Sequence, residues 1–368
     1  MGGFLARIEV QGIRNLGKVS VEPSRHINLL YGANGSGKSS FLEAIYLLGL
    51  GRSFRTSQFR QVIREGESSA TVFGEYLSRQ GITTILGVEK KRDGSTTIRV
   101  NGQPVRTSSE LARRLPLQLI DSRSSWLIEG GPRYRRHYLN WGMFHVEQEF
   151  FPVWRKFLQA LHQRNNALRR RLSDSQISAW DRELVRHAHR ITDSRKRYLS
   201  RLSPLLKNAV GSLLNPEKDR TIELRFFPGW NEEKEGSLEN ALIASLDRDR
   251  EKGYTQLGPH RADLHIFVDG YPAREHVSRG EQKLLAVALQ MCQVELMTRE
   301  IGLNCVLLMD DLPAELDAGH RAALIEYVRR VECQAFVTAT EKGLLEDHLC
   351  RKKDAMFHVE HGSIKKMV

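Results

Sequence analysis

A glycine-rich segment near the start of the chain has residue types and spacing suited to holding the phosphates of a nucleotide. Glycines allow backbone conformations in which several N–H groups turn inward around a phosphate, and a following helix adds partial positive charge at its N-terminus. Lys38 would reach the β- and γ-phosphates, and Ser39 would bind Mg²⁺. The segment therefore predicts a P-loop for ATP and Mg²⁺, although a glycine-rich turn that caps a helix is the plain alternative. Its residues are Gly32, Ala33, Asn34, Gly35, Ser36, Gly37, Lys38, Ser39 and Ser40.

A second candidate is a pair of acids at the end of an apolar run. Residues 305–309 are apolar and are followed directly by Asp310 and Asp311. The first carboxylate suits a Walker B role, in which it holds Mg²⁺ or its water, and Asp311 could orient or deprotonate the attacking water. Acids often follow a buried strand, so this interpretation depends on the P-loop. The two motifs together give three candidate catalytic residues and two candidate Mg²⁺ ligands: Lys38, Asp310 and Asp311, and Ser39 and Asp310.

A third segment opens a helix and admits two compatible interpretations. It reads Ser278-Arg279-Gly280-Glu281-Gln282-Lys283, with apolar residues following on one face of the expected helix. Ser278 and Glu281 have the S-x-x-E spacing of a capping box, which alone would explain both residues. The same helix start could also touch the γ-phosphate through Ser278 and the Gly280 N–H. A capped helix terminus still offers N–H groups, so both interpretations can hold together.

These motifs require particular elements on either side. Residues 27–31 supply an apolar strand before the P-loop, and residues 41–48 supply the helix after it. Asp93 and Gly94 form a turn signal that predicts a β-hairpin. The remaining expected strands are residues 5–10, 72–76, 82–90, 96–100, 305–309 and 335–338. Strands alternating with helices at both ends of the chain predict one α/β layer system completed by distant halves.

The middle of the chain is helical and rich in arginine. Pro152, Pro204 and Pro216 interrupt it, and no strict heptad persists for three or four repeats. We therefore expect short packed helices in an inserted arm rather than a long coiled coil. The predicted segments are residues 1–125 with the P-loop and an antiparallel layer, 126–250 as the arm, and 251–368 with the other two motifs.

Composition limits the class of protein and suggests its partner. The chain has 368 residues, of which 40% are hydrophobic and 27% charged, as in ordinary globular proteins. Its formal charge of +12 favours a polyanion such as nucleic acid or an acidic membrane surface. No run approaches the roughly 18 apolar residues of a spanning helix, and residues 1–6 do not resemble a signal peptide. We expect a cytoplasmic protein with no membrane partner and with reduced cysteines.

Clusters of arginine suggest where a polyanion would bind. The candidates for DNA contacts are Arg52, Arg55, Arg133, Arg135 and Arg136, and residues 169–171 and 195–197 are also basic. Any one cluster could be a solvated helix face, but their joint excess supports a groove that follows phosphates. No zinc-finger, basic-zipper or homeodomain pattern is present, so we expect binding to backbone shape rather than to base sequence.

The three motifs, in this order, resemble those of ABC-type ATPases of the SMC group. The chain is more closely similar to the RecF family of bacterial recombination-repair ATPases, over almost its whole length. That similarity rests on segments 13–15, 51–55, 131–136, 163–165 and 258–263, which read IRN, GRSFR, GPRYRR, QRN and GPHRAD. The resemblance implies an α/β fold, in which an ABC-type P-loop ATPase core is assembled from both ends of the chain around an inserted helical arm.

The resemblance also implies partners and further site residues. Two ATP molecules would be held in a head-to-tail homodimer, so that Ser278 and Gly280 act on the other subunit's nucleotide. The implied nucleotide contacts are Arg14, Asn15, Gln118 in a Q-loop, Asp317 in a D-loop and Thr338 near the γ-phosphate. Asp311 stands where most ABC ATPases carry Glu, which fits slow turnover. The family binds double-stranded DNA near single-strand gaps and works with RecO and RecR to load recombinase.

Other classes remain open from the sequence. A P-loop kinase or small-molecule NTPase would share the first motif but usually makes no use of the Ser278 segment. An ABC transporter subunit would need a surface that couples to membrane spans. A scaffold that binds ATP without hydrolysing it is the third alternative.

Overall fold

The computed structural model describes residues 3–214 and 220–367, and the chain divides into two compact units. One contains residues 1–124 and 297–368, and the other contains residues 125–296. We expected the insert to end at residue 250, whereas the second unit continues to residue 296. The physical reason is pairing within that unit, since the strand 263–268 is hydrogen-bonded to the strand 222–227. The Tyr138 hydroxyl also donates to the Leu289 carbonyl at 2.9 Å.

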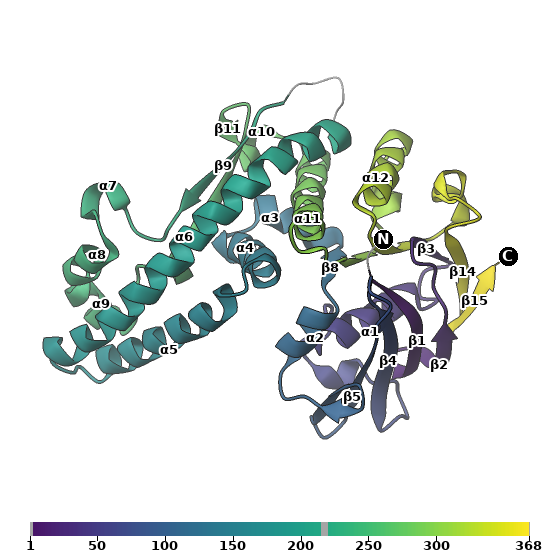
Figure 1. The fold of residues 1–368 in the computed structure, drawn as a ribbon, viewed down its shortest axis with the longest axis horizontal. Helices are drawn as coiled ribbons and strands as arrows, with labels where there is room; N and C mark the ends of the chain where they lie inside the picture. The colour runs from purple at the N-terminus through teal and green to yellow at the C-terminus, as the bar shows by residue number, and fades with distance from the viewer. Residues whose placement is uncertain (1–2, 215–219, 368) are drawn as a thin grey trace. The chain divides into compact units, whose positions relative to one another are not determined.

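Two six-stranded sheets form the frame of the first unit (Figure 1). The antiparallel sheet contains, in spatial order, β2 (Leu16–Val21), β1 (Phe4–Ile13), β4 (Ser69–Leu77), β5 (Thr83–Lys91), β6 (Thr96–Val100) and β7 (Gln103–Pro104). The second sheet contains β15 (Ser363–Met367), β14 (Ala355–Glu360), β3 (Ile27–Tyr31), β13 (Gln334–Ala339), β12 (Val306–Met309) and β8 (Leu117–Ile120). Its strands run parallel except β15, which is antiparallel to β14. Strands from both ends of the chain thus complete one sheet.

The predicted β-hairpin is confirmed. β5 and β6 pair antiparallel, with Lys90 opposite Thr96. Gly94 has φ 96°, a conformation that favours glycine, and the Ser95 N–H donates to the Asp93 carboxylate at 2.7 Å. The turn therefore forms through contacts between neighbouring residues, which is why the sequence pattern predicts it.

The parallel sheet brings three sequence-distant segments to one edge. β3, β13 and β12 are neighbours, and the carboxyl ends of parallel strands lie on the same side of a sheet. The P-loop follows β3, Thr338 lies at the end of β13, and Asp310 follows β12. This edge is therefore where the predicted site assembles.

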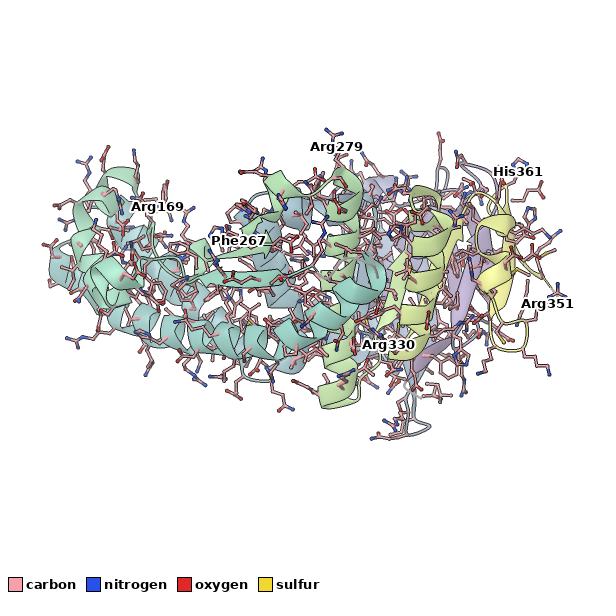
Figure 2. The ribbon with its side chains drawn as sticks, turned by 90° about the horizontal axis from the view of Figure 1, so that it is seen from above. Arg169, Phe267, Arg279, Arg330, Arg351 and His361 are labelled. Carbon is pink, nitrogen blue, oxygen red and sulfur yellow. The ribbon has the colours of Figure 1, made fainter. Side chains whose placement is uncertain are left out.

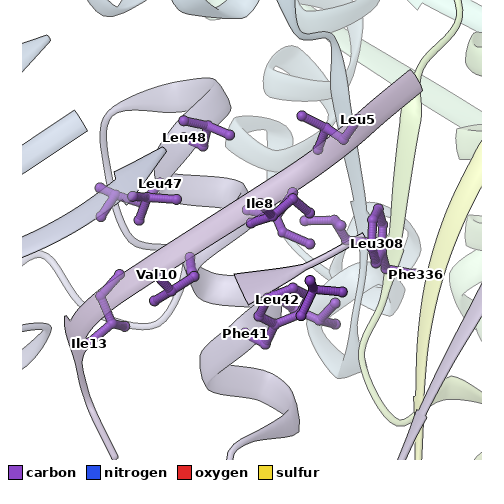
Figure 3. Close-up of a cluster of buried hydrophobic side chains, with 14 of the residues drawn as sticks. Leu5, Ile8, Val10, Ile13, Phe41, Leu42, Leu47, Leu48, Leu308 and Phe336 are labelled. Atoms are coloured by element: carbon purple, nitrogen blue, oxygen red, sulfur yellow. The ribbon is translucent and has the colours of Figure 1, made fainter. Parts of the chain in front are cut away.

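Helix α1 (Lys38–Leu50) is buried between the two sheets and carries the core of the first unit. Its apolar residues point in several directions, which is typical of a helix covered on all sides. Phe41 and Leu42 pack with Leu308 and Phe336 from the parallel sheet and with Ile8 from the antiparallel sheet (Figure 3). Full burial of each such side chain stabilises the fold by roughly 1.5–3 kcal/mol. The P-loop helix is thus held rigidly from both sides.

Shorter helices complete this unit. They are α2 (Ser108–Arg114), α12 (Ala318–Val331) and the 3₁₀ helices η1 (Phe59–Gln61), η2 (Ser122–Ser125), η4 (Leu312–Glu315), η5 (Lys342–Leu344) and η6 (Glu346–His348).

The second unit is mainly helical, with a small three-stranded antiparallel sheet in the order β11, β10, β9. Its helices are α3 (Trp126–Glu129), α4 (Pro132–Val146), α5 (Phe150–Arg169), α6 (Asp174–Leu213), α7 (Glu232–Glu235), α8 (Leu238–Ala244), α9 (Leu246–Lys252), η3 (Pro259–Arg261), α10 (Ala273–His276) and α11 (Arg279–Ile301), whose last residues belong to the first unit. Its strands are β9 (Ile222–Phe227), β10 (Asp263–Val268) and β11 (Tyr271–Pro272). Within the described residues, none of the helices is both long and apolar enough to cross a membrane.

The expectation of short helices in the arm is wrong. α5 and α6 lie side by side, and α6 continues for 40 residues through Pro204 (Figure 1). Pro152 falls in the first turn of α5, where a backbone N–H has no partner within the helix, so proline costs little there. Pro204 is exposed, while the residues around it, such as Leu202 and Leu205, are buried. Packing of the apolar face therefore outweighs the local cost of the proline. Pro216, the third proline of this region, lies outside the described residues.

A buried arginine ties α5 to the rest of the second unit. Arg164 is fully buried, and its guanidinium donates to Asp181 at 2.6 Å, Asp249 at 2.7 Å and Thr255 at 2.9 Å. Asn165 accepts from the Thr255 N–H and hydroxyl at 2.7 and 2.8 Å. The QRN segment is therefore part of a polar network inside this unit.

Candidate nucleotide site

The P-loop has the conformation that its glycines were expected to allow. Gly32, Gly35 and Gly37 have φ values of 156°, 78° and 122°, which residues with a Cβ rarely adopt. A Cβ on Gly32 would also lie 2.1 Å from the Val359 carbonyl oxygen. The loop could not keep this path with larger residues at these positions.

Several carbonyl groups of the loop accept hydrogen bonds. Lys38 Nζ donates to the carbonyls of Gly32 at 2.8 Å and Ala33 at 3.1 Å. The Asn15 side-chain amide donates to the Gly35 carbonyl at 3.0 Å, and another backbone N–H, that of Gly362, donates to the Ser36 carbonyl at 2.8 Å. A peptide whose C=O faces outward presents its N–H on the opposite side, because the trans peptide is planar. The hydrogen bonds from Asn15 and Gly362 therefore orient N–H groups toward the inside of the loop.

The predicted Mg²⁺ ligands come together. The Ser39 hydroxyl donates to Asp310 Oδ1 at 2.8 Å, although the two residues are 271 positions apart. The Thr338 hydroxyl lies 3.0 Å from Asp310 Oδ1 and 3.3 Å from Asp311 Oδ1, and it accepts from the Asp311 N–H at 2.8 Å. Its single hydrogen favours the nearer carboxylate of Asp310. Thr338 therefore links both acids at the edge of the sheet.

The two acids have different environments. Burial raises the pKa of Asp310 above its ordinary value; the Ser39 and Thr338 hydroxyls oppose that rise, the charge of Asp311 adds to it, and Arg55 opposes it. Asp311 has a left-handed backbone, with φ 53°, at the start of η4. Aspartate tolerates this conformation better than most residues. Asp310 is thus a half-buried carboxylate that a cation would stabilise, and Asp311 is placed by the turn that follows β12.

Glu43 organises a cluster of basic residues that the sequence did not reveal. It is fully buried on α1, and both oxygens of its carboxylate accept hydrogen bonds from Arg14 at 2.9 Å. The Ser53 hydroxyl also donates to it, and the Arg55 guanidinium lies 3.8 Å away. A charged residue inside the apolar run 41–48 was the available signal, because buried carboxylates need partners. Arg55 therefore lies at the edge of this cluster; it is exposed, and its predicted contact with DNA stays a prediction.

Gln118 and Asp317 each contact residues close to them in the sequence or in the same sheet. Gln118 is inside β8, opposite Leu307, and its amide lies 3.5 Å from the Leu119 carbonyl. Asp317 is exposed at the N-cap of α12, where it accepts from the His320 N–H at 2.9 Å and lies 2.6 Å from His320 Nδ1. The backbone and side chain of His320 lower the pKa of Asp317. Their predicted contacts with a nucleotide stay predictions.

The capping box at the start of α11 is confirmed. The Ser278 N–H donates to Glu281 at 2.9 Å, and the Glu281 N–H donates to Ser278 Oγ at 3.3 Å. Arg220 is paired with the other oxygen of Glu281 at 2.5 Å. Ser278 and Gly280 are exposed, so the helix start is open to a partner.

The residues of the first unit fit ATP and Mg²⁺. Ser36 Oγ and Asn15 Oδ1 are buried without a hydrogen-bond partner among the described residues, and both lie at the loop. The Gly37 N–H likewise has no hydrogen-bond partner within the described part of the chain. Mg²⁺ is usually bound by one or two carboxylates together with substrate phosphates and water, and Ser39 and Asp310 supply such a partial set.

The candidate DNA-binding arginines differ in their exposure and in their hydrogen bonds. Arg52 and Arg133 are exposed. Arg135 forms a two-fold ion pair with Asp263 at 2.7 and 3.0 Å, and Arg136 donates to the Ala262 carbonyl at 2.9 Å. The sequence suggested that Arg135 contacts DNA. In the structure its guanidinium is already paired with the Asp263 carboxylate, so Arg135 has a structural role.

The cluster at residues 195–197 is only partly a surface cluster. Arg195 is fully buried, donates to the Pro259 carbonyl at 2.8 Å, and packs over the Trp154 ring. Burial, with the charge of Arg136, lowers the pKa of Arg195 to about 9. Arg197 of the same cluster is exposed, as are Arg169, shown in Figure 2, and its neighbours Arg170 and Arg171.

Known proteins share this fold and sequence. The family model described as the RecF/RecN/SMC N terminal domain matches residues 4–365. The fold and the site together define an ABC-type P-loop ATPase of the SMC group. The DNA replication and repair protein RecF of Pseudomonas paraeruginosa is 44% identical over 98% of this chain and 97% of its own, and that of Pseudomonas putida is 43% identical over the same shares. The chain belongs to the RecF family.

Solved structures show the same relationship. The recombination mediator protein RecF with ATP, described as part of the RecFOR pathway, has a TM-score of 0.85 and 27% identity, covering 100% of this chain and 98% of its own. An Smc head domain from Pyrococcus furiosus has a TM-score of 0.61 at 16% identity, covering 99% of this chain and 96% of its own, which shows a shared fold.

Proposed function

We propose that this chain is an ATP-gated DNA-binding ATPase of recombinational repair and replication. ATP binding would drive head-to-tail dimerisation on double-stranded DNA near single-strand gaps, and slow hydrolysis would release it. The observation that carries the proposal is the 2.8 Å hydrogen bond between Ser39 and Asp310, which joins the P-loop to the acids after β12. A P-loop kinase usually makes no use of the Ser278 segment, and family membership leaves this alternative without support.

The residues of the first unit would divide the chemistry as follows. The P-loop N–H groups and Lys38 would hold and neutralise the phosphates, with Arg14 and Asn15 at the loop's outer side. Ser39 and Asp310 would hold Mg²⁺, whose charge offsets that of the phosphates. Asp311 would orient the attacking water, and Thr338 would fix the relative positions of the two acids. Gln118 stays a proposed Q-loop residue.

Dimerisation would complete the site. Ser278 and Gly280 would contact the nucleotide held by a second copy of the chain, and Asp317 would lie at that interface. The exposure of Ser278 and Gly280 supports this proposal, since a buried helix start could not receive a partner. RecF-family relatives described as part of the RecFOR pathway support RecO and RecR as further partners. A cytoplasmic location would fit this role, and the relatives named as DNA replication and repair proteins support it.

DNA binding would depend on phosphate contacts. The net charge of +12 and the exposed Arg52 and Arg133 support it, and Arg136 would contribute only through its partly exposed side chain. A protein that neutralises several phosphates loses affinity steeply as salt rises. An affinity that stays constant over an approximately fourfold rise in salt would contradict this mode of binding.

Light scattering with and without ATP and duplex DNA tests the proposal. We expect a monomer without nucleotide, a dimer with ATP, and retention of DNA by the dimer alone. Lys38→Ala should remove nucleotide binding, and therefore dimerisation, while leaving the fold intact. A monomer that does not respond to ATP would refute the proposal.

A further inference from the structure

The C-terminal hairpin reaches the P-loop within the first unit. β14 and β15 are joined by His361 and Gly362, whose φ values of 47° and 77° are those of a type I′ turn. β14 runs parallel to β3, so this turn lies at the same edge of the sheet as the P-loop. Residues more than 300 positions after the P-loop thus lie directly against it.

The contact between hairpin and loop is a close approach of backbones. A Cβ on Gly362 would lie 2.2 Å from the Asn15 carbonyl oxygen, and a Cβ on Gly32 would lie 2.1 Å from the Val359 carbonyl oxygen. Neither distance is possible for a real side chain. The hairpin, the loop at Asn15 and the P-loop therefore fit together only because glycine stands at both contacts.

One hydrogen bond in this contact has a direct consequence for phosphate binding. The Gly362 N–H donates to the Ser36 carbonyl at 2.8 Å. The Ser36–Gly37 peptide is trans, so its C=O and N–H point in opposite directions. Holding the carbonyl toward the hairpin turns the Gly37 N–H toward the inside of the loop, where a phosphate would accept it. That N–H has no other hydrogen-bond partner among the described residues.

We propose that Gly362 is a positioning residue of the nucleotide site and that the C-terminal hairpin sets the direction of the Gly37 N–H. This inference rests on the proposed function, namely that the P-loop binds ATP. Gly362 touches no nucleotide itself, and it acts through the Ser36 carbonyl. The hairpin is therefore part of the binding site as well as the edge of a sheet.

A matched pair of variants tests the role of Gly362. Gly102 lies in the β6–β7 turn of the same unit, with φ 77° after Asn101 at φ 50°, and a Cβ there would meet nothing within 4 Å. Gly362→Ala and Gly102→Ala therefore introduce the same backbone strain, but only the first pushes the hairpin away from the Asn15 backbone and so from its hydrogen bond with Ser36. Equilibrium binding of fluorescent ATP and ADP analogues to the full chain measures the difference without requiring hydrolysis.

We expect Gly102→Ala to bind like the wild type and Gly362→Ala to bind about tenfold more weakly or worse, since a hydrogen bond to a charged phosphate is lost. The loss should be equal for ATP and ADP, because both carry the phosphates that the loop N–H groups hold. Equal affinities of the two variants would overturn the inference. A wild-type protein that binds neither nucleotide would instead overturn the proposed function.

Hydrogen exchange of the wild type keeps the test decisive if Gly362→Ala fails to fold. ATP should slow amide exchange in residues 355–367 and leave the β6–β7 turn unchanged. Exchange in the hairpin that does not respond to bound ATP would overturn the inference.

Discussion

At the scale of single residues, the candidate site depends on buried charges that hold one another in place. Glu43 has no exposed surface, and it is stabilised by Arg14, with Ser53 and Arg55 nearby. A buried carboxylate without such partners would be strongly unfavourable. The cluster therefore fixes the position of Arg14 beside the P-loop, and Arg14 in turn neutralises Glu43.

Glu43→Gln should destabilise the first unit. The change keeps the shape of the side chain but removes the charge that pairs with Arg14, so we expect the free energy of unfolding to fall by about 1–3 kcal/mol. Glu75→Gln is the matched control, because Glu75 pairs with Arg7 on the surface at 3.7 Å. Scanning calorimetry compares the two, and equal stability would show that the Glu43 pair contributes no more than a surface pair.

His260 should make the stability of the second unit depend on pH. Burial lowers the pKa of His260 to about 4; its bond to the Thr255 carbonyl opposes this, and nearby Arg261, Arg136 and Arg164 add to it. The unfolded chain takes up a proton near pH 6.5, before the folded one does, so the free energy of unfolding falls as pH drops from 6.5 toward 4. From pH 7 to pH 5 this loss is about 2 kcal/mol.

The His260→Gln variant isolates this contribution, since all other groups titrate in both proteins. All five tryptophans lie between residues 125 and 296, so their fluorescence during urea denaturation reports on this unit. The wild type should lose stability relative to the variant as pH falls. A difference that stays constant between pH 7 and pH 5 would contradict a neutral, buried His260.

At the scale of elements, long helices and the parallel sheet serve different purposes. The sheet places the ends of β3, β12 and β13 at one edge, which brings together groups that carry chemistry. The pair of α5 and α6 carries a buried network around Arg164 and places arginines on its exterior. α6 keeps one direction through Pro204 because its buried face continues on both sides of that residue.

Replacing the proline should strengthen α6. Pro204→Ala restores a backbone N–H that can donate to the Ser200 carbonyl, and we expect the second unit to gain about 1–3 kcal/mol in stability. Ser203→Ala, at the exposed neighbouring position, is the control and should change stability by less than about 0.5 kcal/mol. Tryptophan fluorescence during urea denaturation measures both. A loss of stability in Pro204→Ala would mean that the proline fits a bend that the helix needs.

At the scale of the whole molecule, the chain contains two kinds of surface that a second copy would bring together. The P-loop and its acids belong to the first unit, and the exposed Ser278 start of α11 belongs to the second. In the proposed dimer, each copy supplies a P-loop with its acids and a start of α11. Mutations at the start of α11 should therefore affect dimerisation without affecting nucleotide binding.

Ser278→Arg should block dimerisation and ATP hydrolysis while sparing nucleotide binding by the monomer. An arginine side chain would occupy the space of the other copy's phosphate. The control is Ser173→Arg, because Ser173 forms an equivalent exposed capping box with Gln176 in the same unit. Each variant should lose about 1 kcal/mol of helix capping.

Light scattering with ATP distinguishes the two variants. Only Ser278→Arg should remain monomeric. Dimerisation of Ser278→Arg at wild-type ATP concentrations would show that the start of α11 lies outside the interface.

The sequence by itself determined the features that depend on neighbouring residues. The P-loop, the acids after an apolar strand, the Asp93-Gly94 turn and the Ser278 capping box are all set by local backbone and side-chain geometry. The N-terminal and C-terminal α/β segments were also visible as alternating strand and helix patterns.

Only the tertiary structure decided which charges are buried and which distant segments meet. Arg135 and Arg133 look alike in the sequence, yet Asp263, 128 positions further along, pairs with one of them. In the same way, Gly362 gains its contact with Ser36 only when β14 pairs with β3. These outcomes depend on contacts between residues far apart in the chain, which local patterns do not record.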